Sequence, residues 1–213
     1  MRKFCTIILF CCYQIIISQQ VAVLKYDGGG DWYANPTAIP NLIAYTNSRC
    51  HTKIDPNYAT VKPNEYKIYS FPIVFVTGHG NVYFSDEDAS NLRNYLISGG
   101  FLHISDNYGL DPYIRKAIKT IFPENDLVEI PKNHPIYSQT FTFKNGLPKI
   151  HEHDKKPSQG FGVFYEGRLV LFYDYESDLS DGWEDKEVHN NPDNVRELAL
   201  QMGANIIEYA FKH

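Results

Sequence analysis

The sequence predicts an α/β fold, a three-layer sandwich with helices on both faces of a mostly parallel central sheet. Short apolar runs alternate along the chain with longer patterns of helical period, and this alternation is typical of βαβ units. The apolar runs near the N-terminus are continuous, as in strands that are covered on both faces. A β-hairpin and a helix are expected to complete the chain at its C-terminal end.

Six strands are predicted from these runs, with the third in the centre of the sheet. Glu166-Gly167 joins the last two strands and is a two-residue hairpin signal. The predicted strands span residues 21–26, 71–77, 101–105, 127–130, 161–165 and 168–173.

Four helices are predicted from their start signals. Asn35-Pro36, Asp111-Pro112 and Asn191-Pro192 each place a proline directly after a residue that favours the helix N-cap. The remaining helix follows Ser85 and Asp88, which have the spacing of a capping box, and two glycines end it at 99 and 100.

Residues 1–19 are predicted to be a signal peptide, and residues 20–213 a single α/β domain. Arg2 and Lys3 precede an apolar run that ends near Ser18, as in a secretory signal. The run is short for a membrane span, which needs about 20 apolar residues. We therefore expect an exported protein, periplasmic or secreted, that is not an integral membrane protein after cleavage. An uncleaved N-terminal anchor is the alternative.

The cysteine content and the net charge of the chain exclude several kinds of site and ligand. Three of the four cysteines lie in the predicted signal peptide, so Cys50 alone remains, and neither an internal disulfide nor a cysteine-based metal site is expected. The formal net charge is −5, and no basic cluster follows Lys3. Binding of nucleic acid, which depends on neutralising phosphates, is therefore not expected.

Polar and glycine-rich clusters follow four of the predicted strands: "YDGGGDWY", "TGHGN", "SDNYG" and "YESDLSDGWED". Open parallel sheets bind ligands beyond the carboxyl ends of their strands, so a pocket is expected there. Asp106, His79 and His153 are the candidate catalytic residues. The candidate ligand-binding residues are Asp27, Gly29, Gly30, Asp31, Trp32, Gly78, Gly80, Asn107, Tyr108, Glu176, Asp181 and Trp183.

The stretch "HEHD" at 151–154 suggests a divalent metal as cofactor. Histidines two residues apart on an extended segment point the same way, which suits two metal ligands. The candidate ligands are His79, His151, His153 and Asp154. The spacing matches no established zinc signature, and a hydrogen-bonded loop is the alternative. The other clusters have ordinary alternatives too: a flexible glycine turn, a solvated acidic loop, and a tryptophan that fills the space beneath a loop.

Several longer motifs carry a family resemblance: "LKYDGGGDWY", "TGHGNVYFSDED", "GLPKIHEHD", "GFGVFYEGRLVLFY" and "VHN". Together, over roughly residues 21–211, the chain resembles a bacterial family known as domain of unknown function 4159. The resemblance implies a class I glutamine amidotransferase-like fold, which is flavodoxin-like. Catalytic members of that fold carry a cysteine after the strand corresponding to 101–105. Ser105-Asp106-Asn107 stands there in this chain, so glutaminase activity is not expected.

Two functions remain open from the sequence. In the first, an exported protein binds or acts on a polar small molecule or glycan in the His/Asp/Trp pocket, with metal assistance and, if it is an enzyme, hydrolase-type chemistry. In the second, the chain is a non-catalytic binding or scaffold module of a cell-envelope system and has an envelope protein partner. Converging acids and imidazoles would favour the first, whereas scattered ones beside an exposed apolar patch would favour the second.

Overall fold

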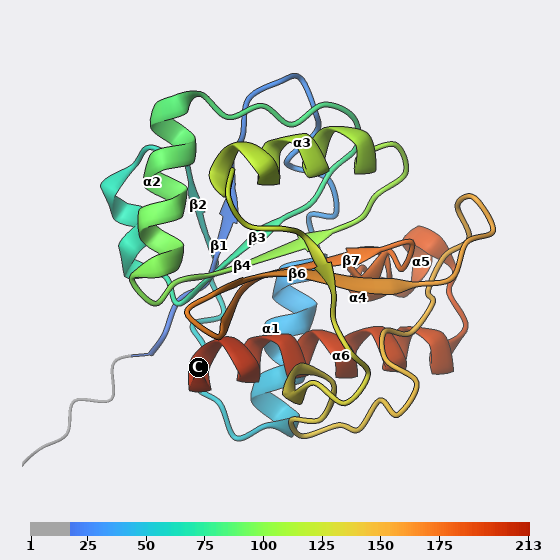
Figure 1. The fold of residues 1–213 in the computed structure, drawn as a ribbon. Helices are drawn as coiled ribbons and strands as arrows, with labels where there is room; N and C mark the ends of the chain where they lie inside the picture. The colour runs from blue at the N-terminus through green and yellow to red at the C-terminus, as the bar shows by residue number, and fades with distance from the viewer. Residues whose placement is uncertain (1–17) are drawn as a thin grey trace, which may run out of the picture.

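The computed structural model of the protein describes residues 18–213, and the predicted signal peptide lies almost entirely outside them (Figure 1). Within the described residues, seven strands form one sheet in the order β2-β1-β3-β4-β7-β6-β5. The strands are β1 (Ala22–Leu24), β2 (Ala59–Val61), β3 (Ile73–Val76), β4 (Phe101–Ser105), β5 (Val128–Glu129), β6 (Gln159–Tyr165) and β7 (Arg168–Tyr175).

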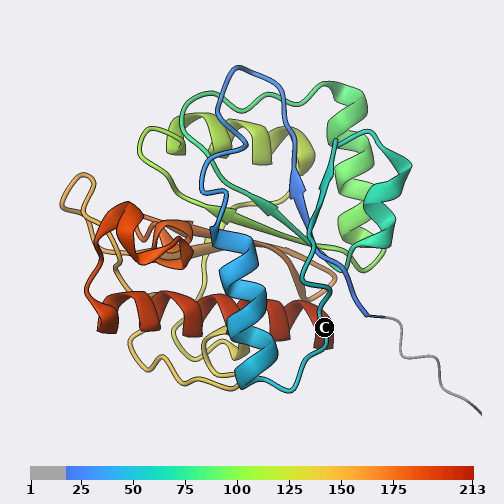
Figure 2. The same cartoon turned by 180° about the vertical axis from the view of Figure 1, so that it is seen from behind.

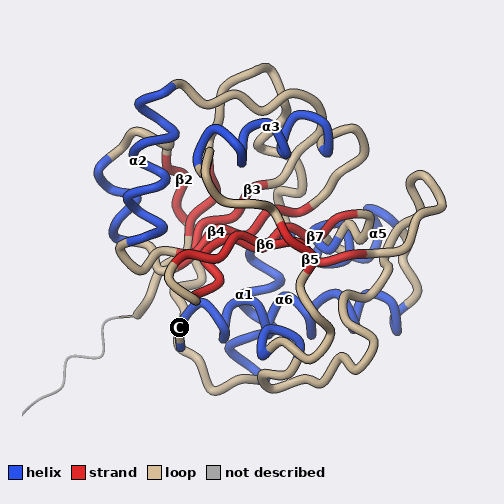
Figure 3. The backbone as a smooth tube through the Cα atoms, in the orientation of Figure 1, coloured by secondary structure: helices blue, strands red, loops and turns tan. Residues whose placement is uncertain are grey.

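The helices form one layer on each side of this sheet. α2 and α3 cover one face, while α1 and α6 cover the other (Figures 1 and 2). The strands lie between these two layers (Figure 3). The helices are α1 (Ala38–Arg49), α2 (Asp86–Ile97), α3 (Asp111–Ile121), α4 (Leu179–Trp183), α5 (Lys186–His189) and α6 (Asp193–Lys212), with 3-10 turns η1 (Tyr66–Ser70) and η2 (Pro135–Tyr137).

The prediction of an α/β fold with a mostly parallel sheet is confirmed. β2, β1, β3, β4 and β7 run parallel to one another. β6 is antiparallel to β7, and β5 is antiparallel to β6. β4 lies in the centre, as expected. The predicted hairpin is the β6–β7 pair, whose turn residues Glu166 and Gly167 have φ angles of 49° and 82°. Both values are left-handed, as a type I′ turn requires.

Three segments differ from the sequence prediction. β2 was not predicted, because three residues with an exposed Thr60 in the middle give too short a pattern. The strand predicted at 127–130 is only the exposed pair Val128–Glu129, and it is antiparallel to β6. The acidic segment after β7, predicted as a loop, forms α4 and α5. Every residue of α4 is buried, so packing against the rest of the fold, rather than the local pattern, determines this helix.

Two apolar cores fill the space between the layers. One lies between the sheet and α2 and α3, and the other between the sheet and α1, α4 and α6. The predicted capping box at the start of α2 is confirmed, since the Ser85 hydroxyl accepts a hydrogen bond from Asp88 N and the Asp88 carboxylate accepts one from Ser85 N. Among residues 18–213, no helix is long and apolar enough to cross a membrane.

Candidate functional site

The polar clusters meet at one edge of the sheet. Because β1, β3, β4 and β7 are parallel, the loops that follow them leave from the same edge. The segment around "HEHD" joins them there. Ile150 N and His151 N both donate to Ser177 O, at 3.0 and 3.2 Å, and Lys149 Nζ lies 2.9 Å from Glu176 Oε2. The histidine-rich segment therefore lies directly against the loop that follows β7.

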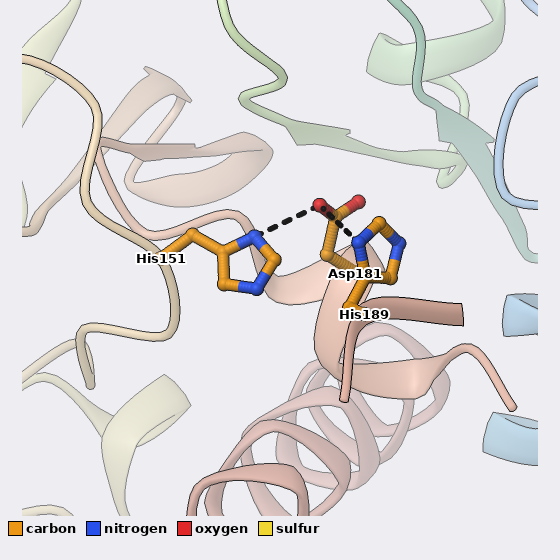
Figure 4. Close-up of side chains that lie close together, drawn as sticks. All are labelled: His151, Asp181 and His189. Atoms are coloured by element: carbon orange, nitrogen blue, oxygen red, sulfur yellow. Dashed lines mark ion pairs between the residues drawn. The ribbon is translucent and has the colours of Figure 1, made fainter. Parts of the chain in front are cut away.

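Three side chains from different segments converge at this edge. His151 belongs to the histidine-rich segment, Asp181 to α4, and His189 is the last residue of α5. Their ligand atoms all lie within 4.8 Å of one another. His151 Nδ1 is 3.0 Å, and His189 Nδ1 is 3.4 Å, from the same oxygen, Asp181 Oδ2. Figure 4 shows both imidazole rings with a nitrogen directed toward this carboxylate.

Three asparagines hold the ligand atoms in place. His151 Nε2 lies 2.8 Å from Asn191 Oδ1, so the imidazole has a carbonyl-type acceptor on the side away from Asp181. Asn35 Nδ2 donates to Asp181 Oδ1 at 2.6 Å, and Asn107 Nδ2 donates to the same oxygen at 3.3 Å. Such outer hydrogen bonds orient the ligands in metal sites and fix the tautomer of a ligating histidine. They leave Asp181 Oδ2 and the two Nδ1 atoms facing one another.

The hydrogen bonds of this cluster favour the protonated form of His151. Hydrogen bonding to Asp178 and Asp181 raises the pKa of His151 to about 10. Burial alone would raise the pKa of Asp181, but its contacts with His151 and His189 lower it. The cluster is thus an ion pair of imidazolium and carboxylate. A divalent ion would take the place of this proton, since a ligating imidazole must be neutral.

A second imidazole–carboxylate pair borders the first. His153 Nε2 lies 2.8 Å from Asp178 Oδ2, and that oxygen is 3.8 Å from His151 Nδ1. Asn107 Nδ2 donates to the other oxygen of Asp178 at 3.1 Å. The exposed ring of Tyr108 meets the His153 ring edge-on, with 5.6 Å between centroids. Hydrogen bonding to Asp178 raises the pKa of His153. Asp178 therefore orients His153 beside the cluster of His151, Asp181 and His189, called the metal-type cluster below.

These groups line an open, polar pocket of about 470 Å³. Its lining residues are His79, Tyr108, His151, Glu152, His153, Asp178 and Asp181. On the rim, His79 Nδ1 lies 3.1 Å from Asp31 Oδ2. A neighbouring hollow of about 320 Å³ is also lined by Tyr108 and His153, and it contains Asp106. The candidate catalytic residues His79, His153 and Asp106 thus border two adjoining hollows.

Asp106 directly follows β4 and is buried. Its Oδ2 accepts a hydrogen bond from Glu176 N at 2.8 Å. Burial, with a smaller contribution from the nearby Asp174, raises the pKa of Asp106 to about 7 against the opposing effect of that hydrogen bond. A carboxyl group with a pKa near neutrality can both give and take a proton, as a general acid or base must.

We expect Asp106 to make folding stability depend on pH. Its folded pKa lies above the ordinary 3.8. Its contribution is therefore fully present below about pH 4 and is lost as the pH rises through about 7. Relative to Asp106→Asn, the free energy of unfolding of the wild type should fall by on the order of 2–4 kcal/mol between acidic and mildly alkaline pH. Urea unfolding of both proteins across this range measures the difference.

The matched control is Asp126→Asn, because the Asp126 side chain is 88% exposed. This variant should follow the pH dependence of the wild type. Parallel profiles for the wild type and Asp106→Asn would contradict the raised pKa of Asp106.

A histidine and an aspartate form a buried pair beneath the site. His103, in the middle of β4, places Nε2 2.9 Å from Asp174 Oδ2 on β7, and both side chains are fully buried. Burial lowers the pKa of His103 to about 3 and raises that of Asp174 well above its ordinary value. The pair joins the two central strands below the carboxyl edge.

The glycine clusters mainly let the loops pack closely. A side chain at Gly30 would lie 2.7 Å from Asn81 O and 2.8 Å from His79 O, and one at Gly78 would meet Asp31 O at 2.8 Å. Gly30 N donates to Asn81 O at 3.0 Å. Gly29 and Gly80 have open space around them and left-handed φ angles. The loops after β1 and β3 are thus held together, and their contact places Asp31 beside His79.

Several other candidate residues lie away from the cluster. Asp154 is exposed and pairs with Lys156. Asp27 joins Tyr83 in an isolated β-bridge. Glu176 is buried and pairs with Lys149. Trp183 is in the core, where Nε1 donates to Ala199 O at 2.8 Å. Trp32 is partly buried and lines a separate cavity.

Of the four candidate metal ligands, only His151 belongs to the three-residue cluster. Asp181 joins it from the candidate ligand-binding set, and His189 was missed by the sequence analysis. His189 lies eight positions after Asp181, in a segment for which a solvated acidic loop was the alternative prediction. The available signal was the "VHN" motif, which places a histidine shortly after a run of acids.

Comparison with known proteins gives a family match over most of the chain. The family model described as "Domain of unknown function (DUF4159)" matches residues 20–211, which includes every residue of the site above. No curated protein matches the chain.

Proposed function

We propose that His151, Asp181 and His189 bind a divalent metal ion at the carboxyl edge of the sheet. The chain belongs to the family of domain of unknown function 4159, and the proposal is made for this member of it. The observation that carries the proposal is the convergence of both Nδ1 atoms on one carboxylate oxygen. The asparagines that hold His151 and Asp181 from behind support it, because metal ligands are commonly oriented in this way.

The ligand set favours a catalytic type of site. Two imidazoles and one carboxylate are the protein ligands of several catalytic zinc centres, in which water occupies the remaining position. The same set suits Fe²⁺, so the ligands alone leave two metals open. Such a metal would supply a water molecule that loses its proton near neutral pH. The side chains of His151 and His189 are each 27% exposed, which leaves the cluster accessible from solvent.

The surrounding residues support a hydrolase-type activity. We assign to His153, oriented by Asp178, the role of accepting a proton from the attacking water. Asp106 would return a proton to the leaving group as the bond in the substrate breaks. The water thus supplies a hydroxyl to one product and a proton to the other. The convergence of these acids and imidazoles favours an active site over a scaffold role.

The rim suits a polar substrate. Asp31, His79, Tyr108 and Glu152 are partly or fully exposed around the opening, so hydrogen-bonding groups outnumber apolar ones there. We therefore propose a polar small molecule or a glycan as the ligand. We also propose that the protein binds it outside the cytoplasm, after residues 1–19 have been removed. We also retain the relation to the class I glutamine amidotransferase-like fold as a proposal, with Asp106 or Asn107 at the position of the catalytic cysteine.

The proposal is tested on residues 20–213, purified without a histidine tag. After removal of metal with a chelator, calorimetric titration with Zn²⁺ should give one tight site per chain. Metal-loaded protein should hydrolyse at least one member of a panel of chromogenic esters, phosphate esters and glycosides, and the stripped protein should not. No tight site for Zn²⁺ or Fe²⁺ would refute metal binding. A tight site without turnover of any member would limit the function to binding.

A further inference from the structure

A second cavity, of about 250 Å³, lies on the face of the sheet that α1 covers. It is enclosed by the loop after β1, the start of α1 and the neighbouring strands. Its walls are largely apolar and aromatic. The main apolar side chains around it are Val23, Trp32, Tyr33, Ile39, Phe75 and Trp183.

Three hydroxyl groups give one part of this cavity a polar surface: those of Thr77, Ser105 and Ser180. Ser105 Oγ accepts a hydrogen bond from Ser180 N at 3.0 Å. The Ser180 hydroxyl has a single hydrogen-bond contact within the described residues, a long one of 3.3 Å to Thr77 Oγ1. It therefore retains hydrogen-bonding capacity for a ligand.

His103 also lines this cavity, next to Phe75 and Trp183. Its Nδ1 is buried and lacks a hydrogen-bond partner, the one such side-chain nitrogen or oxygen found in residues 18–213. Buried polar atoms are nearly always paired. Because this nitrogen has almost no accessible surface, a ligand in the cavity would contact the three hydroxyl groups rather than Nδ1.

Aromatic rings line the more exposed part of the cavity. Tyr33 is 67% exposed, and Trp32 is partly buried. Their rings meet edge-on with 5.5 Å between centroids, and Lys25 Nζ lies 5.1 Å from the centre of the Trp32 ring. Rings of this kind at an opening provide apolar contact area for an entering ligand.

We propose that this cavity is a binding site for a small molecule with one aromatic ring, or a branched aliphatic group of similar size, and a single hydroxyl or carbonyl group. The volume fits, because an apolar cavity of about 150 Å³ already holds benzene. A sugar does not suit it, since most of its hydroxyls would face apolar walls without partners.

This site goes beyond the metal-dependent activity proposed above and does not rest on it. The two sites are nevertheless neighbours. Asn35 lines the cavity, and its Nδ2 donates to Asp181 Oδ1 at 2.6 Å. Asn35 Oδ1 lies 3.0 Å from Thr77 Oγ1, one of the cavity hydroxyls. One amide side chain thus separates the cavity from the metal-type cluster.

Phenol is the test probe, because it combines one ring with one hydroxyl. In metal-free protein with excess chelator, phenol at millimolar concentration should shift the NMR signals of Thr77, Ser180 and the Trp32 indole. Glucose should not shift them. Ala38→Leu should weaken phenol binding at least tenfold, because Ala38 is buried in the cavity wall and the larger side chain fills the space.

Thr60→Phe provides a second test in case Ala38→Leu fails to fold. Thr60 lines the cavity from the exposed side of β2, where an aromatic residue is well tolerated. The matched control is Ala44→Leu, at an exposed position of α1, which should bind phenol as the wild type does. The proposal is wrong if phenol causes no shifts at Thr77 and Ser180, or if the folded filling variants bind it as tightly as the wild type. Either result leaves the metal proposal untouched, because no metal is present.

Discussion

Replacing His189 by alanine should lower the affinity for Zn²⁺ at least about 100-fold, because even residues that only orient a ligand contribute 10–100-fold to metal affinity. His189 supplies one of the three ligand atoms in the cluster. The change should have little effect on stability, since His189 ends a four-residue helix without a buried residue. Calorimetric titration with Zn²⁺ measures the affinity, and thermal unfolding of the metal-free protein measures the stability.

Val188→Ala is the matched control, because Val188 is 51% exposed on the same short helix and supplies no ligand. It should bind Zn²⁺ as the wild type does. His153→Ala gives a second comparison, since the sequence pattern alone favours His153 as a ligand. A greater loss of affinity from His153→Ala than from His189→Ala would place the ion beside Asp178 and contradict the cluster described here.

Replacing Trp183 by alanine should lower the free energy of unfolding by about 3–5 kcal/mol, the range measured for removing a large aromatic side chain from a core. Trp183 is 1% exposed. Its ring packs 6.1 Å from Phe75 and 5.5 Å from His103, centroid to centroid. The substitution also removes the indole N–H that donates a hydrogen bond to the Ala199 carbonyl. Denaturant unfolding of metal-free protein measures the change.

The matched control is Trp32→Ala, which removes the same side chain from a partly exposed position. Its effect on the free energy of unfolding should be clearly smaller. Equal and small effects of the two substitutions would instead favour the sequence-based reading, in which both tryptophans flank a ligand.

The sheet and its main helices could be predicted because their signals are local. β4 was predicted with its observed limits, since five consecutive residues of one buried strand give a clear pattern. α3 begins at Asp111, where the Asp-Pro signal places it. β5 was misread because 127–130 resembles a buried strand, although Val128 and Glu129 are exposed at the sheet edge. Sequence pattern cannot tell how far a short apolar run is covered by distant parts of the chain.

The site was predicted in part, and the missing part has a physical cause. Acidic residues in α4 and on either side of it suggested solvent exposure, yet Asp178, Asp181 and Glu184 are all buried. Their partners come from far away in the sequence: Asn107 bonds to Asp178, and Thr37 N donates to Glu184 Oε1 at 2.9 Å. Burial of a carboxylate is acceptable only with such partners. Because the partners cannot be read from the local sequence, neither α4 nor the position of His189 could be predicted.

The sheet ends on both sides in very short strands, which offer another chain little backbone to pair with. β2 has three residues and β5 has two, and each forms one edge of the sheet. A long exposed edge offers unpaired backbone groups to which a strand of another molecule can add, the first step toward aggregates. Where β5 ends and leaves β6 uncovered, Asn125 Nδ2 donates to Phe164 O at 3.0 Å and occupies one of these groups. Little template for cross-β growth therefore remains at either edge.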